Sequence, residues 1–147
     1  MVGYQKYQAN QVEGSGPLGL VLLTYEAMYK SLIHAHRAIE GNDIAEEVKH
    51  VSRAQEAIIE LSSSLDMQQG GEVAKNLAQL YLYMYTQLSE GMCRSSTQSV
   101  DEVMKLAQSL REGWQSLEAK KNHNDSQIQP LPTAFQQQTS KVAAYAR

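Results

Sequence analysis

Histidine is the residue type in this chain best suited to chemistry, because an imidazole can bind a metal, carry a proton or accept a phosphoryl group. His34 and His36 are two residues apart, so a helix places them on different faces, where they cannot share a metal ion. Glu47 and His50 have the Glu-x-x-His spacing of di-iron helical bundles. Such sites need a second motif of this kind and two further glutamates. The sequence contains no second Glu-x-x-His, so we expect a solvated charged face and no metal.

His50 also carries the alternative function that the sequence leaves open. Arg53 and the small Ala54 follow it, which weakly resembles a histidine phosphotransfer bundle, in which an exposed histidine accepts phosphate. We find no glycine-rich phosphate loop, nucleophile elbow or Cys/His cluster. The single Cys93 excludes an internal disulfide and fits a reducing compartment. We therefore expect no enzyme activity and no cofactor.

Length and charge narrow the class of protein further. The 147 residues suit one domain, and the longest apolar run, residues 18–23, is too short for a membrane span. The N-terminal residues lack the apolar stretch of a secretory signal. The net charge of −3 lacks the basic excess expected of a nucleic-acid binder. We expect a soluble cytoplasmic protein without membrane insertion or a nucleic-acid partner.

Proline and glycine positions predict the fold. Pro17, Pro130 and Pro132 are the only prolines, so residues 18–129 contain none of the residues that interrupt helices. Glycines at 41, 70–71 and 91 divide this interval into segments of about twenty residues, a length typical of helices. Four amphipathic helices joined by short breaks predict an all-α, antiparallel four-helix bundle.

The helix ends and core faces are predicted from local signals. Pro17 suits the first helical position and Gly41 a left-handed end, while Asp43 and Ser99 are each followed three residues later by glutamate, as in a capping box. The expected core positions recur every three or four residues. They are Leu18, Leu22, Tyr25, Tyr29, Leu32, His36 and Ile39; Ile44, Val48, Val51, Gln55, Ile58, Leu61 and Leu65; Val73, Leu77, Leu80, Met84 and Leu88; and Val100, Val103, Ala107, Leu110, Trp114 and Leu117.

The two ends of the chain differ from the middle. Residues 1–16 are polar with a few apolar residues, which predicts an N-terminal arm or a short helix. Residues 17–121 form the bundle. Residues 122–147 are rich in glutamine and contain two prolines, a composition that buries little surface, so we expect a flexible tail.

One block of the sequence resembles a known family. Residues 70–84, GGEVAKNLAQLYLYM, resemble the signature of the flagellin export chaperones, the FliS-like proteins of bacterial flagella. Residues 54–61 are similar to the second helix of that family, and Trp114 lies where its last helix carries a tryptophan. The resemblance covers about residues 4–119. Two features depart from it: Gly16 stands before Pro17 where the family usually has serine, and the glutamine-rich tail lies outside the pattern.

The resemblance implies a function and two partners. Chaperones of this family bind the disordered C-terminal segment of flagellin one to one, prevent its premature polymerisation and deliver it to the cytoplasmic domain of the flagellar type III export gate. The N-terminal arm of the family lies near the flagellin groove and is linked to the gate. The sequence leaves open which flagellin is the client and whether the free chaperone forms a weak homodimer.

The residues themselves suggest where a client would bind. A bundle holds an amphipathic segment in grooves between its helices, which requires more apolar residues than the core can use. Leu20 and Leu23 are such a surplus in the first helix, and Leu82 and Tyr83 in the third, where burial on several sides of a central helix is the alternative. The predicted flagellin-binding or arm residues are Tyr4, Tyr7, Val12, Leu20, Leu23, Leu82 and Tyr83.

Overall fold

Four helices joined by short connections make up the described part of the chain. The computed structural model describes the backbone of residues 2–123 and the side chains of residues 18–120. The helices are α1 (Val2–Glu40), α2 (Ile44–Ser63), α3 (Gly71–Arg94) and α4 (Thr97–His123), and residues 2–123 contain no strand. The predicted all-α class is confirmed. The predicted tail lies almost entirely outside the described residues.

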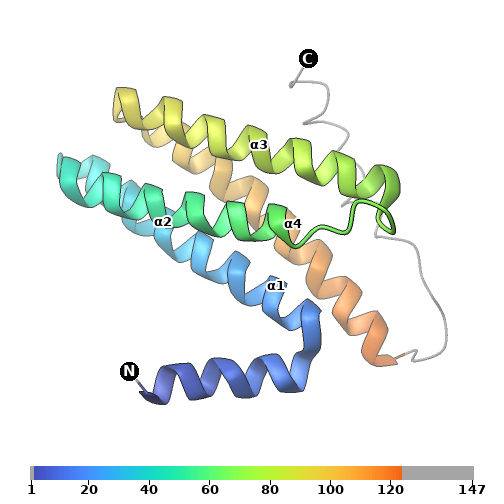
Figure 1. Cartoon of the computed structure of the whole chain (residues 1–147). Coiled ribbons are helices and arrows are strands. Elements are labelled where there is room, and N and C mark those ends of the chain that lie inside the picture. The colour runs from blue at the N-terminus through green and yellow to red at the C-terminus, as the bar shows by residue number, and fades with distance from the viewer. Residues whose placement is uncertain (1, 124–147) are drawn as a thin grey trace.

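The helices form an antiparallel bundle in which each helix packs against two neighbours. α1 packs against α2 and α4, and α3 packs against the same two helices, so α1 and α3 lie at opposite corners. Figure 1 shows the α2–α3 connection at the end of the bundle towards which α4 also runs. The α1–α2 and α3–α4 connections lie at the other end. The two ends therefore differ in which loops and termini they present.

The core of the bundle combines aliphatic side chains with two tyrosines. Met28 and Ala35 are fully buried on α1, whereas Tyr29 and His36, which the sequence predicts to be core residues, are only half-buried. Tyr25, Leu32 and Ile39 are buried as predicted, so the predicted α1 seam is correct at these positions and wrong at Tyr29 and His36. The buried cluster consists of Tyr25, Met28, Leu32, Ala35, Ile39, Val51, Ala54, Ala57, Ile58, Leu61, Leu77, Leu80, Tyr81, Met84, Leu88, Val100, Val103, Leu106, Ala107 and Leu110.

The start of α2 also faces a different way from the prediction. Ile44 and Val48 are 67% and 42% exposed, although the sequence pattern assigns them to the core. Glu47 is buried in their place, and its Oε2 accepts a hydrogen bond of 3.2 Å from Ser95 Oγ at the end of α3. Because Glu47, Val51 and Ile58 face inwards together, the first turn of α2 leaves its two aliphatic residues in solvent.

The N-terminal part of α1 is helical and points away from the bundle. α1 begins at Val2, so the prediction that Pro17 takes the first helical position is wrong. Figure 1 shows a sharp bend in the early part of α1, after which the helix joins the bundle. Pro17 follows Gly14 and Gly16, and a proline without an N–H inside a helix is a recognised cause of such a bend. Residues 2–16 are thus a helical arm.

The helix ends confirm one predicted cap and correct two. Asp43 accepts a hydrogen bond from the Glu46 backbone N–H at 3.2 Å, as its position predicts. The left-handed residue after α1 is Asn42, with φ of 55°, and not Gly41. Asparagine tolerates this conformation better than most residues. α4 begins at Thr97, two residues before the predicted Ser99.

Gly91 has a packing role and is not a break. α3 continues through it to Arg94 and ends at Ser95, whose φ is 48°. A Cβ atom at position 91 would lie 2.5 Å from the Cβ of Ser99 on α4. The absent side chain therefore lets α3 and α4 approach each other closely where they converge on their connection.

Candidate functional site

An apolar surface lies along the outer side of α2 and α3. We define the α2–α3 strip as Ile44, Val48 and Ile59 of α2 with Leu82 and Tyr85 of α3. Ile59 is 52% exposed and Leu82 67%, and the other three are also exposed. Exposed large apolar side chains on neighbouring helices make this side of the bundle a candidate binding surface.

The contacts of Gln55 show that Ile59 of α2 lies at a similar height along the bundle to Leu82 and Tyr85 of α3. Its buried side-chain amide donates to the Tyr85 carbonyl at 3.2 Å and to Ser89 Oγ at 2.7 Å, which joins α2 to α3 at this point. Ile59 is one turn beyond Gln55 on α2, and Leu82 is about one turn before Tyr85 on α3. Because the helices are antiparallel, both steps lead towards the α2–α3 connection (Figure 1). Ile59, Leu82 and Tyr85 therefore lie at similar levels along α2 and α3.

A separate cavity opens at the end of the bundle that carries the α2–α3 connection. Its volume is about 320 Å³, and all four helices contribute to it. Its walls are largely apolar, and Tyr81 and Trp114 bring aromatic rings to it. Ser64, Asp66 and Gln69 of the connection add polar groups. We call this the end cavity.

A buried hydrogen-bonded trio lies beside the end cavity. The hydroxyl groups of Tyr25 and Tyr81 share a hydrogen bond of 2.6 Å, which joins α1 to α3 across the centre of the bundle. Trp114 Nε1 donates to the Tyr25 hydroxyl at 3.3 Å. Burial raises the pKa of Tyr81 to about 12 and raises that of Tyr25 well above its ordinary value. Both hydroxyls therefore stay neutral, and the trio fixes the relative positions of three helices.

The predicted binding residues do not form one patch. Leu82 lies on the strip, whereas Leu20, 50% exposed, is on α1 at the opposite corner of the bundle. Leu23 is half-buried and lines a second cavity of about 200 Å³ between α1 and α4, beside the Glu26–Arg111 ion pair.

Tyr83 points towards a different neighbour from Leu82. It is half-buried against the core, and its hydroxyl donates a hydrogen bond to the Glu102 carboxylate of α4. The side chains of Tyr4, Tyr7 and Val12 lie outside the described residues. Sequence reasoning missed Ile59 and Tyr85, although the excess of apolar residues in α3 was a usable signal for Tyr85.

His50 does not have the exposure that phosphotransfer requires. Its side chain is 12% exposed, and its Nε2 is 3.0 Å from Glu46 Oε2. The ring stacks on His34 with 4.9 Å between centroids, and Nδ1 is buried. A phosphoryl donor needs open access to one ring nitrogen, and neither has it. The structure therefore argues against the phosphotransfer alternative.

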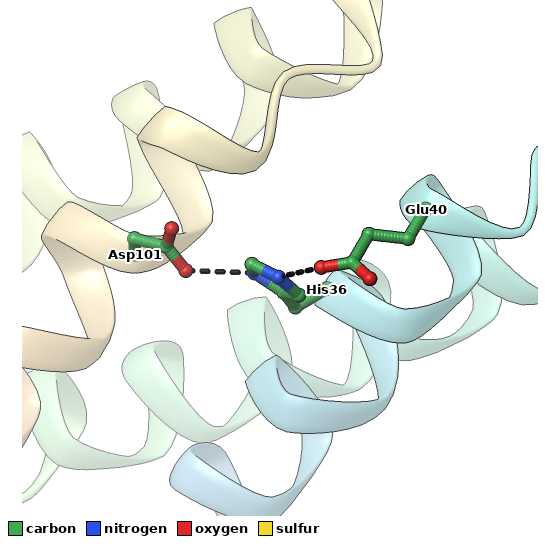
Figure 2. Close-up of polar contacts among 3 residues, drawn as sticks. All are labelled: His36, Glu40 and Asp101. Atoms are coloured by element: carbon green, nitrogen blue, oxygen red, sulfur yellow. Dashed lines mark hydrogen bonds and ion pairs between the residues drawn. The ribbon is translucent and has the colours of Figure 1, made fainter.

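His36 forms the main titratable contact between α1 and α4. Its Nδ1 lies 2.7 Å from Asp101 Oδ1, and its Nε2 contacts the Glu40 carboxylate (Figure 2). Desolvation lowers the pKa of His36, but the hydrogen bonds and charges of Asp101 and Glu40 raise it by more, so the net pKa is raised. The ring bridges two carboxylates, an arrangement that favours its protonated form and joins the end of α1 to the start of α4.

The described residues hold neither a metal cluster nor a membrane span. Among residues 18–120, no group of three or more histidine, cysteine, aspartate or glutamate side chains is placed to hold a metal ion. No helix in the same part of the chain has the length and hydropathy of a membrane span.

Comparison with known proteins gives a consistent result. The family described as "Flagellar protein FliS" matches residues 1–121. The chain is 30% identical over 127 residues to the flagellar secretion chaperone FliS of Campylobacter jejuni, covering 86% of this chain and 95% of that one. It is 28% identical over 116 residues to FliS of Salmonella typhimurium, covering 78% and 86%. It is 33% identical over 107 residues to the flagellar secretion chaperone FliSB of Pseudomonas aeruginosa, covering 73% and 85%.

The family match covers the helical arm and nearly the whole bundle, including the residues of the strip and of the end cavity. The glycine-to-tyrosine block of residues 70–84, which suggested the resemblance, forms the start of α3 and part of the end cavity. The chain therefore belongs to the FliS family of flagellar secretion chaperones.

Proposed function

We propose that this protein binds the disordered C-terminal segment of flagellin one to one in the cytoplasm, prevents its premature polymerisation and delivers it to the flagellar export gate. Membership of the FliS family supports the class of client. The observation that carries the proposal is the exposed α2–α3 strip, because five large apolar side chains of two neighbouring helices face solvent there. The protein acts by binding and catalyses no reaction.

The dimensions of the strip suit a helical client. Ile44 and Ile59 are fifteen residues apart on α2, which is about 22 Å of helix. An amphipathic client segment of about four turns would match this length, with anchors spaced at i, i+3, i+4 and i+7. Leu82 is 67% exposed, so its further burial would contribute about 1–2 kcal/mol. Several such contacts are needed to offset the cost of ordering a disordered segment.

Calorimetry with a peptide of the flagellin C-terminal segment tests the proposal. We expect a one-to-one complex with the full chain. The variant Ile59→Ala/Leu82→Ala should weaken binding at least about tenfold, equivalent to about 1.4 kcal/mol. The matched control is Lys105→Ala/Gln108→Ala, which changes two exposed residues of α4 and should leave the affinity unchanged. Absence of a complex at high micromolar concentration would refute the proposed client.

We assign the other predicted residues to two partners, the flagellin client and the export gate. We assign Leu20 and Leu23 of α1 and Tyr83 of α3 to secondary client contacts at the bundle surface. We assign Tyr4, Tyr7 and Val12 to the helical arm that reaches the cytoplasmic domain of the export gate. Tyrosine suits this exchange of partners because its ring is apolar and stiff while its hydroxyl stays polar. The arm variant Tyr4→Ala/Tyr7→Ala, described below, tests the role of the arm.

A further inference from the structure

The end cavity is large enough to take side chains from another segment. A cavity of about 150 Å³ with aliphatic and aromatic walls holds one benzene ring, so the 320 Å³ measured here has room for about two apolar side chains. Its aliphatic walls come from Val21, Leu61, Leu65, Val73 and Leu77. Concave apolar sites with a few polar groups are typical binding sites.

The chain carries a suitable segment directly after α4. Trp114 of α4 lines the cavity, and α4 ends nine residues later at His123, a rise of about 13.5 Å. Leu131 follows His123 by eight residues, and an extended chain of that length spans about 26 Å. Leu131 and Phe135, the only phenylalanine of the sequence, can therefore reach back to the cavity.

The composition of this segment fits the cavity in two respects. Pro130 and Pro132 flank Leu131 and restrict its backbone, so that ordering it loses less conformational entropy. The neighbouring glutamines at 127 and 129 can hydrogen-bond with the polar groups of Ser64, Asp66 and Gln69 at the cavity.

We propose that the C-terminal segment of this chain docks intramolecularly into the end cavity, with Leu131 and Phe135 as the inserted side chains. The attachment to α4 keeps the segment at a high effective concentration, which favours it over a second copy of the chain. The N-terminal arm is a less suitable occupant because it leads away from the bundle in Figure 1. The docked segment would cover Trp114 and Tyr81 in the free protein. The proposal does not depend on the identity of the client.

Trp114 is the only tryptophan and reports directly on the cavity. In the full chain, Leu131→Ala/Phe135→Ala should increase acrylamide quenching of Trp114 about twofold and shift its emission to longer wavelength, because the ring gains an open side. The matched control Gln136→Ala/Gln137→Ala should leave both quantities unchanged. If neither variant changes the quenching, or if both change it equally, the assignment of Leu131 and Phe135 is wrong.

A spin label gives an independent measurement. A nitroxide on Gln136→Cys, in a chain whose exposed Cys93 is replaced by serine, should broaden the amide resonances of residues 64–74. Residues 41–47 at the other end of the bundle serve as the internal control and should stay sharp. Broadening of both regions, or of neither, would overturn the proposal. Broadening that appears in a mixture of spin-labelled and separate isotope-labelled chains would identify a second copy as the occupant and refute intramolecular docking.

Discussion

The close approach of α3 and α4 at Gly91 leads to a sharp prediction about stability. An alanine Cβ at position 91 would lie 2.5 Å from Ser99 Cβ and 2.8 Å from Ser99 Oγ. Carbon atoms in contact are normally about 3.5–4.0 Å apart, so the two helices would have to separate by about 1 Å. Such overpacking typically costs about 1–3 kcal/mol.

The helix propensity of alanine acts in the opposite direction. Alanine is more favourable than glycine in a helix interior by about 0.8–1.0 kcal/mol. We therefore expect Gly91→Ala to destabilise the parent chain by about 1 kcal/mol. In a Ser99→Gly background the clash is absent, and the same substitution should stabilise by up to about 1 kcal/mol. The sign of the effect thus reverses between the two backgrounds.

The free energies of unfolding of the parent, Gly91→Ala, Ser99→Gly and the double variant can be measured by urea unfolding, with the circular dichroism signal of the helices as the readout. The coupling free energy between positions 91 and 99 should be about 1–3 kcal/mol. Independent sites add within about 0.5 kcal/mol, so a coupling below that value would refute the packing role of Gly91. If the dependence of the free energy of unfolding on urea concentration differs between variants, the unfolded state has changed. The stabilities of the variants are then compared by their thermal midpoints.

Three further predictions concern the core, the histidine contact and the arm. Leu77→Ala, which truncates a side chain 2% exposed, should cost about 2–5 kcal/mol, and an unchanged urea midpoint would contradict its place in the core. Because the pKa of His36 is raised on folding, its ion pairs stabilise the fold fully below the unfolded pKa and cease to do so as pH rises through the folded pKa. His36→Gln should therefore lower the free energy of unfolding by up to about 1 kcal/mol near pH 6 and leave it unchanged near pH 9. An equal loss at both pH values would exclude the charge mechanism. Tyr4→Ala/Tyr7→Ala should keep the helical content, change melting only slightly and alter flagellin affinity or delivery to the gate. Gross unfolding, or unchanged binding and secretion in a folded variant, would refute the assigned role of the arm.

The sequence predicts the number and order of the helices well because those depend on local signals. The absence of proline from residues 18–129 and the glycines at 70–71 limit where helices can run. The cap at Asp43 is a contact between neighbours in sequence, and the structure confirms it. The α1 bend was missed because Pro17 fits a helix start and a helix bend equally well, and only the chain before it decides between them.

The errors in the core are local. On α2, Val51, Gln55, Ile58 and Leu61 are buried as predicted, and the error lies at the start of the helix. There the hydrophobic pattern favours Ile44 and Val48, whereas the structure buries Glu47. The hydroxyl of Ser95, distant in sequence, donates to Glu47 and reduces the cost of burying that carboxylate. No local pattern contains that partner.

Leu82 and Tyr83 show where the prediction of the binding surface reaches its limit. Both belong to an apolar run in α3, and consecutive residues of a helix point about 100° apart, so at most one of them can face a given groove. The buried seam of Leu77, Leu80, Met84 and Leu88 sets the rotation of α3. With that rotation, Tyr83 lies on the α4 side, where its hydroxyl donates to the Glu102 carboxylate, and Leu82 lies exposed on the other side. Because the core and not this hydrogen bond decides which face of α3 is exposed, Tyr83→Phe should loosen the α3–α4 side while leaving client affinity at Leu82 unchanged, and a change in that affinity would contradict the reasoning.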